Sequence, residues 1–305
     1  MIRFVASKVL QSILTLFGVL TAAFFLVRLS GDPTALMLSE QASAAEVAAM
    51  RGALGLDRPL WFQYAVFLNR ALHADLGESL RQHVPALALV LERLPATLEL
   101  ALTAFVLGIG LAFAAVLAVR LSGSRRLRSI LFWLALTRQA IPVFWFGLLL
   151  ILLFSVTLRW LPSLGRGGIL HLILPAMTLA TFELALYFRL LDSAFAEQQD
   201  QDYVRTARAK GQTQARIVLQ HMLPNALLPL ITIAGINLGV LLGGTVVTET
   251  VFSWPGVGRL IVQAVSQRDY PVIIAGVMVT SAIFVMLNLV VDLLYAVLDP
   301  RVRLS

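Results

Sequence analysis

Six long apolar stretches dominate the hydrophobic pattern of this chain. They run over Val9–Val27, Thr97–Val119, Ser129–Val156, Leu172–Leu190, Asn225–Val247 and Ile273–Leu298. A membrane-spanning helix needs about 20 mostly apolar residues, and each stretch meets or approaches that length. Arg3 and Lys8 precede the first stretch as in a signal peptide, but the run is long for one and no small-x-small cleavage site follows. The pattern therefore predicts an all-α integral membrane protein with six transmembrane helices.

The predicted helices divide the chain into three regions. Residues 1–27 contain the N-terminus and the first helix, residues 28–96 form an external segment, and residues 97–305 form a five-helix core with a long cytoplasmic segment at 191–224. In the external segment, Asp57 is a candidate N-cap and Pro59 suits a first helical turn. The apolar residues that follow share one face of a predicted helix: Leu60, Tyr64, Phe67, Leu68 and Leu72.

Positive charge in the short connections predicts the orientation of the chain. The connection Arg120–Arg128 contains four arginines and no acid. Arg3 and Lys8 lie in the N-terminus, and Arg301 and Arg303 lie in the tail. Cytoplasmic loops of membrane proteins carry an excess of Lys and Arg. We therefore expect both termini in the cytoplasm.

Composition supports a membrane protein and narrows its chemistry. The 305 residues are 59% hydrophobic and 13% charged, whereas soluble domains are about 45–50% apolar and about 25% charged. The chain has no cysteine, which excludes disulfides and thiolate metal sites. The net charge of +7 is explained by basic connections between apolar segments, so no nucleic-acid partner is expected. No GxxxxGK[ST] phosphate loop or HExxH motif is present, so ATP hydrolysis would require another polypeptide.

The segment Tyr203–Pro224, YVRTARAKGQTQARIVLQHMLP, has the signals of two short helices. Alanines and long basic residues favour a helix up to Lys210, and Gly211 is a natural stop because glycine adopts the left-handed conformation without steric cost. Thr213 can cap a second short helix, and Pro224 marks the start of the fifth span. We predict two short helices on the cytoplasmic face, joined at the glycine.

This segment resembles the cytoplasmic loop motif of bacterial ABC importer permeases. That motif reads Glu-Ala-Ala, then a glycine, then Leu-Pro about a dozen residues later; here Ala207 keeps the third position, Gly211 is the glycine and Leu223-Pro224 is the Leu-Pro. Asp202–Gly211 resembles the version in the oligopeptide, dipeptide, glutathione and nickel branch. Other patches similar to that branch are Gly31–Pro33, Leu54–Leu60, Leu76–Leu80, Leu94–Ala101, Trp254–Leu260, Arg268–Ile273 and Asp299–Arg303. Their order covers essentially the whole chain.

The resemblance implies a type I importer permease of the bacterial inner membrane. Its implied partners are a second homologous permease, two ATP-binding-cassette ATPase domains, an extracytoplasmic substrate-binding protein and membrane lipid. ATP and Mg would bind to the partner subunits, with no cofactor and no metal in this chain. Peptides, including di- and oligopeptides or glutathione, are the leading cargo, and nickel or a metal chelate is the alternative. A stand-alone ion-coupled secondary transporter is the hypothesis from a different class.

The resemblance also implies that the ATPases dock on the short helices. The candidate coupling residues are Tyr203, Arg205, Ala207, Lys210, Gly211, Leu223 and Pro224. The competing interpretation is an amphipathic surface helix that binds anionic lipid.

Ionisable residues inside membrane spans are costly and mark candidate functional groups. The candidates for a substrate path are Arg138, Glu183, Asn237 and Asn288. Glu183 either pairs with Arg138 or is protonated, or it faces the substrate as an acid. Arg138 precedes Pro142, which is expected to kink the third helix, and its guanidinium can pair with Glu183 or attract a substrate carboxylate. Asn288 and Asp292 share a face, and a structural role is favoured for Asp292.

Two further groups have both a structural and a functional interpretation. Gly235, Gly239 and Gly243 recur every four residues and permit close helix approach, either within this subunit or at the pore or the partner permease. Trp254, Pro255 and Gly256 form an external turn in an apolar loop. This turn is either a gate or contact for the binding protein, or a structural plug over the helix ends.

Overall fold

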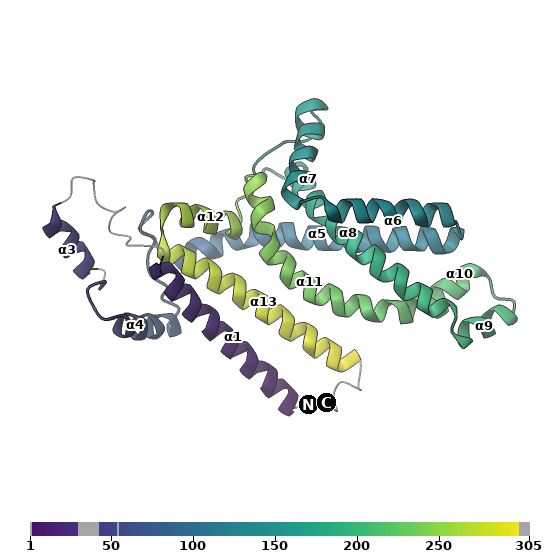
Figure 1. The fold of residues 1–305 in the computed structure, drawn as a ribbon, viewed down its shortest axis with the longest axis horizontal. Coiled ribbons are helices and arrows are strands. Elements are labelled where there is room, and N and C mark those ends of the chain that lie inside the picture. Colours follow the sequence, from purple (N-terminus) through teal and green to yellow (C-terminus); the bar gives the residue numbers. More distant parts are fainter. Residues whose placement is uncertain (1, 30–42, 54, 299–305) are drawn as a thin grey trace. The chain divides into compact units, whose positions relative to one another are not determined.

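The computed structural model describes residues 2–29, 43–53 and 55–298 (Figure 1). The chain divides into two compact units, one of residues 1–97 with 255–289 and the other of residues 98–254 with 290–305. Three features of the sequence lie outside the described residues: the patch Gly31–Pro33, residue Leu54, and the tail Asp299–Arg303 with its two arginines.

Five helices of the described chain are long and apolar enough to cross a membrane. They lie within α1 (Ile2–Leu29), α5 (Ala86–Ser122), α8 (Ile169–Gln199), α11 (Leu223–Val251) and α13 (Tyr270–Leu298). A sixth span is formed by α6 (Arg125–Ala140) with α7 (Val143–Leu150) and the π-helix η1 (Ile151–Thr157), when this bent pair is counted as one. The all-α membrane fold is therefore confirmed.

The bend between α6 and α7, in the third predicted span along the chain, lies where the sequence predicts it. The helices on either side of Ile141-Pro142 meet at 107°. Pro142 serves as the N-cap of α7, with φ −56° and ψ 139°. Proline has no N–H to donate, and its ring also disfavours a helical conformation at Ile141, which is extended with ψ 124°.

The second span begins earlier than predicted. The sequence analysis ends the external segment at residue 96, before Thr97, but α5 starts at Ala86 and contains Pro95. Its first turns pack in a hydrophobic cluster with α12 (Val257–Gln267) and the start of α13. Helix propensity alone would end a helix at Pro95. The packing of the first turns stabilises α5 on both sides of this proline.

Two surface helices of the first unit are α3 (Ala44–Ala53) and α4 (Leu60–Leu72). Phe67 and Leu68 of α4 pack on a cluster formed by α1 and α13, as the predicted face requires. Leu60 and Leu72 of that face are instead 54% and 85% exposed. The Asp57 N-cap is wrong, because α4 begins at Leu60 and Pro59 occupies the cap position without a side-chain hydrogen bond.

The apolar segment after α11 contains the amphipathic helix α12. Its residues Val257, Leu260 and Ala264 are buried against the first turns of α5 and α13. It ends at Arg268, which has a left-handed conformation with φ 52°. Asp269 follows and accepts hydrogen bonds from Ser79 Oγ at 2.5 Å and from the Leu80 N–H at 3.1 Å. These bonds tie the start of α13 to the segment between α4 and α5.

The core of the second unit lies between α5, α8 and α11. It extends into α9 (Asp202–Ala209) and the π-helix η2 (Ile217–Met222), which follow α8 at one end of this unit (Figure 1). α8 continues to Gln199, beyond the predicted end at Leu190. Buried residues of this extension, including Leu191 and Phe195, support the short helices that follow.

Candidate functional site

The short helix α9 rests on the core through one face. Val204 and Ala207 are three residues apart, so they share a helical face, and both are buried in the cluster with Phe195. Arg205 and Arg208 are exposed on the remaining surface. The result is a compact helix whose own backbone is hydrogen-bonded and whose outer face is positively charged.

Gly211 ends this helix as predicted. The Gly211 N–H donates to the Arg208 carbonyl at 2.9 Å, and the Gln212 N–H donates to the Ala207 carbonyl at 3.2 Å. This pair of bonds is a Schellman motif, which requires a left-handed residue at the position of the glycine. Gly211 has φ +72° and open space around its Cα. A side chain here is therefore strained by the backbone conformation and not by a neighbour.

Thr213 caps the next helix, but that helix is not a separate short element. Thr213 Oγ1 accepts from the Arg216 N–H at 3.4 Å, and α10 (Gln214–Arg216) then runs through η2 directly into α11. Pro224 lies in the first turn of α11, where a missing N–H is tolerated. The wider π-helical turn before it relieves the clash that a proline ring makes with the carbonyl four residues earlier.

Polar side chains join the residues around Gly211 to the long helices. Asn225 Nδ2 donates to the Tyr203 hydroxyl at 3.3 Å and to the His221 carbonyl at 3.0 Å. The Tyr203 hydroxyl donates to Gln198 of α8, and the His221 ring pairs with Gln212 at 2.7 Å. Tyr203 therefore links α8, α9 and α11. The sequence analysis named Tyr203 but missed its partners.

A buried ion-pair cluster braces the same end of the second unit. Asp192 of α8 accepts from Arg120 Nη2 at 2.6 Å and from Arg128 Nε and Nη2 at 2.9 and 2.8 Å. Arg120 also donates to the Asp192 backbone carbonyl. The sequence analysis left Asp192 unnamed within the cytoplasmic segment 191–224 and treated the arginines of Arg120–Arg128 as orientation signals. Beyond a connection with four arginines and no acid, the sequence holds no local signal of this cluster.

Glu183 and Asn237 form the polar contact inside the spans. Asn237 Nδ2 donates to Glu183 Oε2 at 3.2 Å, and Glu183 is 5% exposed. A Cβ on Gly108 of α5 would lie 2.6 Å from the Glu183 Cβ, so only glycine lets α5 approach α8 this closely. The sequence analysis missed Gly108, because its spacing from Glu183 carries no local signal.

Arg138 does not pair with Glu183 in the described structure. Its guanidinium donates to Thr181 Oγ1 at 2.9 Å, to the Thr178 carbonyl at 2.8 Å and to the Ile141 carbonyl at 3.1 Å. It also lies 4.1 Å from the centre of the Phe146 ring. Arg138 thus donates hydrogen bonds to backbone carbonyl groups at the α6–α7 bend and on the adjacent helix α8. Of the four candidate path residues, Glu183 and Asn237 are brought together; Asn288 is half-buried on α13 in the other unit.

The glycine stripe has unequal surroundings. A Cβ on Gly235 would lie 2.5 Å from Val291 Cγ1, so this glycine permits close packing of α11 on α13. Gly243 has open space around it. The two ends of the stripe therefore differ, one packed within this subunit and one free to meet another surface.

Trp254 is fully buried, with the Arg166 guanidinium 5.8 Å from its ring centre. The backbone N–H of Trp254 donates to the Glu249 backbone carbonyl at 2.8 Å. Pro255 and Gly256 follow in the other unit, and Gly256 is the N-cap of α12. A surface contact through the Trp254 side chain is therefore not available in this conformation.

Comparison with known proteins identifies the chain. Residues 104–304 match the family described as binding-protein-dependent transport system inner membrane component, and residues 1–101 match the N-terminal region described for the same membrane components. The chain belongs to this family. As a binding-protein-dependent transport permease it is a multi-pass inner membrane protein, and the resemblance drawn from its sequence patches is confirmed.

Similar permeases match over their full length. The di/tripeptide transport system permease protein DppB of Pseudomonas aeruginosa is 39% identical, with 99% of each chain covered. The glutathione transport system permease protein GsiC of Escherichia coli is also 39% identical, again with 99% of each chain covered. The dipeptide transport system permease protein DppB of Escherichia coli is 35% identical over 99% of each chain.

A solved structure shares the fold of this permease. The crystal structure of an amino acid ABC transporter with histidines matches with a TM-score of 0.51 and 18% identity, covering 70% of this chain and 94% of that chain. At this identity the likeness concerns the fold alone. It agrees with the ABC importer permease architecture expected from the sequence.

Proposed function

We propose that this chain is a permease subunit of an ATP-binding-cassette importer that carries short peptides by alternating access. We assign short peptides as the cargo because the chain is similar over its full length, at 39% identity, to permeases named for di/tripeptides and for glutathione. Glutathione is itself a tripeptide, so both names describe short peptides. The energy comes from ATPase subunits on separate polypeptides, which also hold ATP and Mg.

The ATPase-coupling surface is α9 with the turn at Gly211. A helix anchored by Val204 and Ala207 and braced through Tyr203 can transmit movement as a rigid element, because its backbone bonds are internal. Its exposed Arg205 and Lys210 provide a charged face for a soluble partner domain. Leu223 and Pro224 at the start of α11 carry the movement into a membrane span.

The proposed orientation places this surface and both termini in the cytoplasm. The facing ends of α5 and α6, from Arg120 to Arg128, contain four arginines and no acid, as is typical of cytoplasmic loops. The importer then contains a second homologous permease, two ATPase domains, and an extracytoplasmic binding protein on the opposite side. Glu183 and Asn237 are the proposed polar groups of the path, and Pro255 with Gly256 belongs to the proposed external contact region.

A reconstituted transport assay tests this function. The chain is purified from its native membrane in mild detergent, the co-purifying proteins are identified, and the complex is placed in liposomes with a labelled tripeptide. A second permease, an ATPase and uptake that requires ATP are expected. Recovery of the chain alone, with uptake in liposomes that lack ATP, would replace the importer with an ion-coupled transporter. ATP-dependent uptake of a nickel chelate but not of peptide would retain the importer and replace its cargo.

A further inference from the structure

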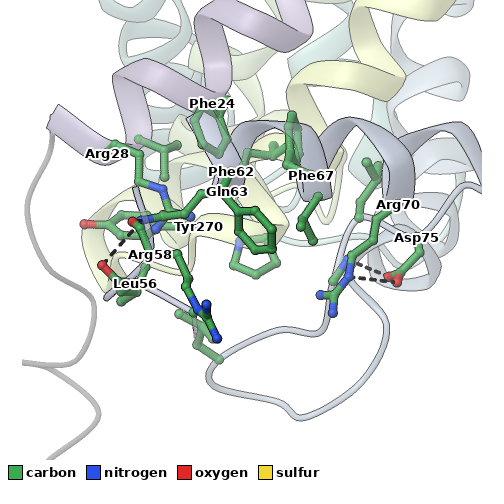
Figure 2. A pocket seen from close by; sticks show the side chains of 18 of the residues that line it. Phe24, Arg28, Leu56, Arg58, Phe62, Gln63, Phe67, Arg70, Asp75 and Tyr270 are labelled. Atoms are coloured by element: carbon green, nitrogen blue, oxygen red, sulfur yellow. Dashed lines mark hydrogen bonds and ion pairs between the residues drawn. The ribbon is translucent and has the colours of Figure 1, made fainter. Parts of the chain in front are cut away.

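A pocket of about 500 Å³ lies in the first unit (Figure 2). One wall is built by the ends of two membrane spans, with Phe24 and Val27 from α1 and Tyr270 and Ile274 from α13. The other walls come from α4, from the end of α3 and the segment that joins it to α4, and from the segment after α4. Its volume is in the range of small-molecule sites, which are about 300–1,000 Å³.

The pocket lies beside the ends of two candidate membrane spans. The span in α1 ends at Leu29 and the span in α13 begins at Tyr270, and the end of a span is where a chain is expected to pass from the hydrocarbon into the headgroup region. Tyr and Arg side chains are favoured at this level, because one end is apolar and the other hydrated. This placement depends only on the membrane spans and not on the proposed cargo or coupling.

The outer surface of α4 also indicates contact with lipid. Trp61 is 71% exposed, and Leu60 beside it and Leu72 at the other end of α4 are also exposed, while Phe67 and Leu68 pack on the protein core. A helix that is apolar on both faces is poorly suited to water. Helices with exposed Trp and Leu commonly lie in the membrane interface.

The pocket has an aromatic end and a cationic end. Figure 2 shows the guanidinium groups of Arg58 and Arg70 on the side of the pocket away from Phe24. Arg58 lies 5.7 Å from the centre of the Phe62 ring. Arg70 is 4.0 Å from Asp75, an exposed pair whose mutual attraction is weak. The lining contains three arginines and one aspartate, and the third arginine, Arg28, lies at the aromatic end, 5.2 Å from the centre of the Phe24 ring.

Gln63 holds the cationic end in place. Its side-chain Nε2 donates to the Arg58 carbonyl at 2.6 Å and to the Leu56 carbonyl at 3.3 Å. These bonds fasten the segment that carries Arg58 onto α4. The wall is therefore organised before any ligand enters, which lowers the entropic cost of binding.

We propose that this pocket binds an anionic phospholipid from the membrane surface at which α1 ends. The phosphodiester lies between Arg58 and Arg70, since guanidinium groups recognise phosphate oxygen through charge-assisted hydrogen bonds. The first part of the acyl chains lies against Phe24 and Val66. An acidic segment of a partner protein would satisfy the arginines, but it would not account for the apolar end or for the position at the ends of two spans.

Native mass spectrometry of the purified full-length chain tests the proposal. Bound phosphatidylglycerol is compared with phosphatidylcholine in wild type, in Arg58→Gln/Arg70→Gln, and in Arg81→Gln. Arg81 is an exposed arginine of the same unit outside the pocket, so it controls for charge. The double variant is expected to lose phosphatidylglycerol affinity by about ten-fold or more, with phosphatidylcholine unchanged and Arg81→Gln like wild type. Equal lipid binding in all three proteins overturns the proposal.

A second variant tests the apolar end without touching the arginines. Val66 is a partly exposed residue of α4 that lines the pocket, so Val66→Trp places a large side chain inside it. This variant is expected to reduce phosphatidylglycerol binding several-fold, with the elution profile of the protein unchanged. Inorganic phosphate is added as a competitor. Full displacement of the lipid by millimolar phosphate assigns a phosphate site and overturns the lipid assignment. Loss of binding-protein docking in Arg58→Gln/Arg70→Gln, with lipid binding intact, assigns the pocket to a protein partner instead.

Discussion

Two short surface helices, α9 and α4, differ mainly in the face that does not touch the protein. Both rest on their own unit through a few apolar residues, Val204 and Ala207 in α9 and Phe67 and Leu68 in α4. The outer face of α9 has Arg205 and Arg208 and is followed by Lys210, whereas the outer face of α4 has Trp61 and other large apolar residues.

The difference shows that the buried face sets where a helix is attached and the exposed face sets what it meets. A charged face remains hydrated until a complementary protein surface arrives, so α9 suits a soluble domain. An apolar face is stable only where something covers it, so α4 suits the membrane interface. The following variants test this distinction, from the largest expected effect to the smallest.

Replacing Asp192 with alanine should remove the brace beneath α9. Arg120 and Arg128 then lose a buried partner, and breaking a buried pair costs about 3–5 kcal/mol. That cost falls mainly on Arg120, whose side chain is 12% exposed, because the 51% exposed side chain of Arg128 remains hydrated. We expect a lower apparent melting temperature in detergent and faster amide hydrogen exchange in α9, with exchange in α4 unchanged. The exposed Asp200→Ala is the control. An unchanged melting temperature in Asp192→Ala would contradict the brace.

Replacing Gly211 with leucine should uncouple transport from ATP hydrolysis. A left-handed residue with a Cβ costs about 1–2 kcal/mol, and relief of that strain displaces the end of α9. We expect transport and stimulation of the ATPase to fall about ten-fold or more, with normal membrane insertion. Transport retained in Gly211→Leu would refute the coupling role.

Two matched variants separate the role of Gly211 from its conformation. Gly123 also has positive φ, +63°, and open surroundings, but it lies between α5 and α6. Gly123→Leu should leave coupling near wild type. Gly211→Asn should restore most of it, because asparagine tolerates the left-handed region.

Reversing the charge of Arg205 and Arg208 tests the outer face of α9. These arginines are exposed, and under the proposed coupling role they would attract the ATPase subunit through long-range electrostatics. We expect affinity for the isolated ATPase subunit to drop about ten-fold at low salt and by less as salt is raised. Arg70→Glu in α4 should leave this affinity unchanged. A salt-independent loss would indicate misfolding of α9 and not a lost charge contact.

Replacing Trp61 with serine tests the outer face of α4 and should have the smallest effect. The side chain is 71% exposed and has an edge contact with the neighbouring Phe62 ring, so its removal costs the chain little internal packing. We expect amide exchange in α4 to rise several-fold in lipid nanodiscs, equivalent to about 1 kcal/mol of lost interfacial contact, and to be unchanged in α9. Equal exchange in wild type and Trp61→Ser would remove α4 from the interface.

Local signals predicted much of the fold and part of the candidate site. Gly211 and Thr213 were placed correctly, because helix ends depend on conformational preferences of single residues. The bend at Pro142 was predicted for the same reason. The Asp57 cap and the separate helix before Pro224 were wrong, since packing and a π-helical segment moved the boundaries.

The sequence by itself determined that this protein is an all-α membrane protein, because spans, breakers and charged connections act over one helix or one loop. The ordered patches of the sequence added the resemblance to importer permeases. Only the tertiary structure decided that Asp192 pairs with Arg120 and Arg128 and that Asn237 hydrogen-bonds Glu183. It also decided that Arg138 hydrogen-bonds the Ile141 carbonyl at the α6–α7 bend and does not form an ion pair with Glu183. Residues on different helices meet through packing geometry. Their spacing in the chain does not record which faces turn toward each other, so these contacts could not be read from the order of residues.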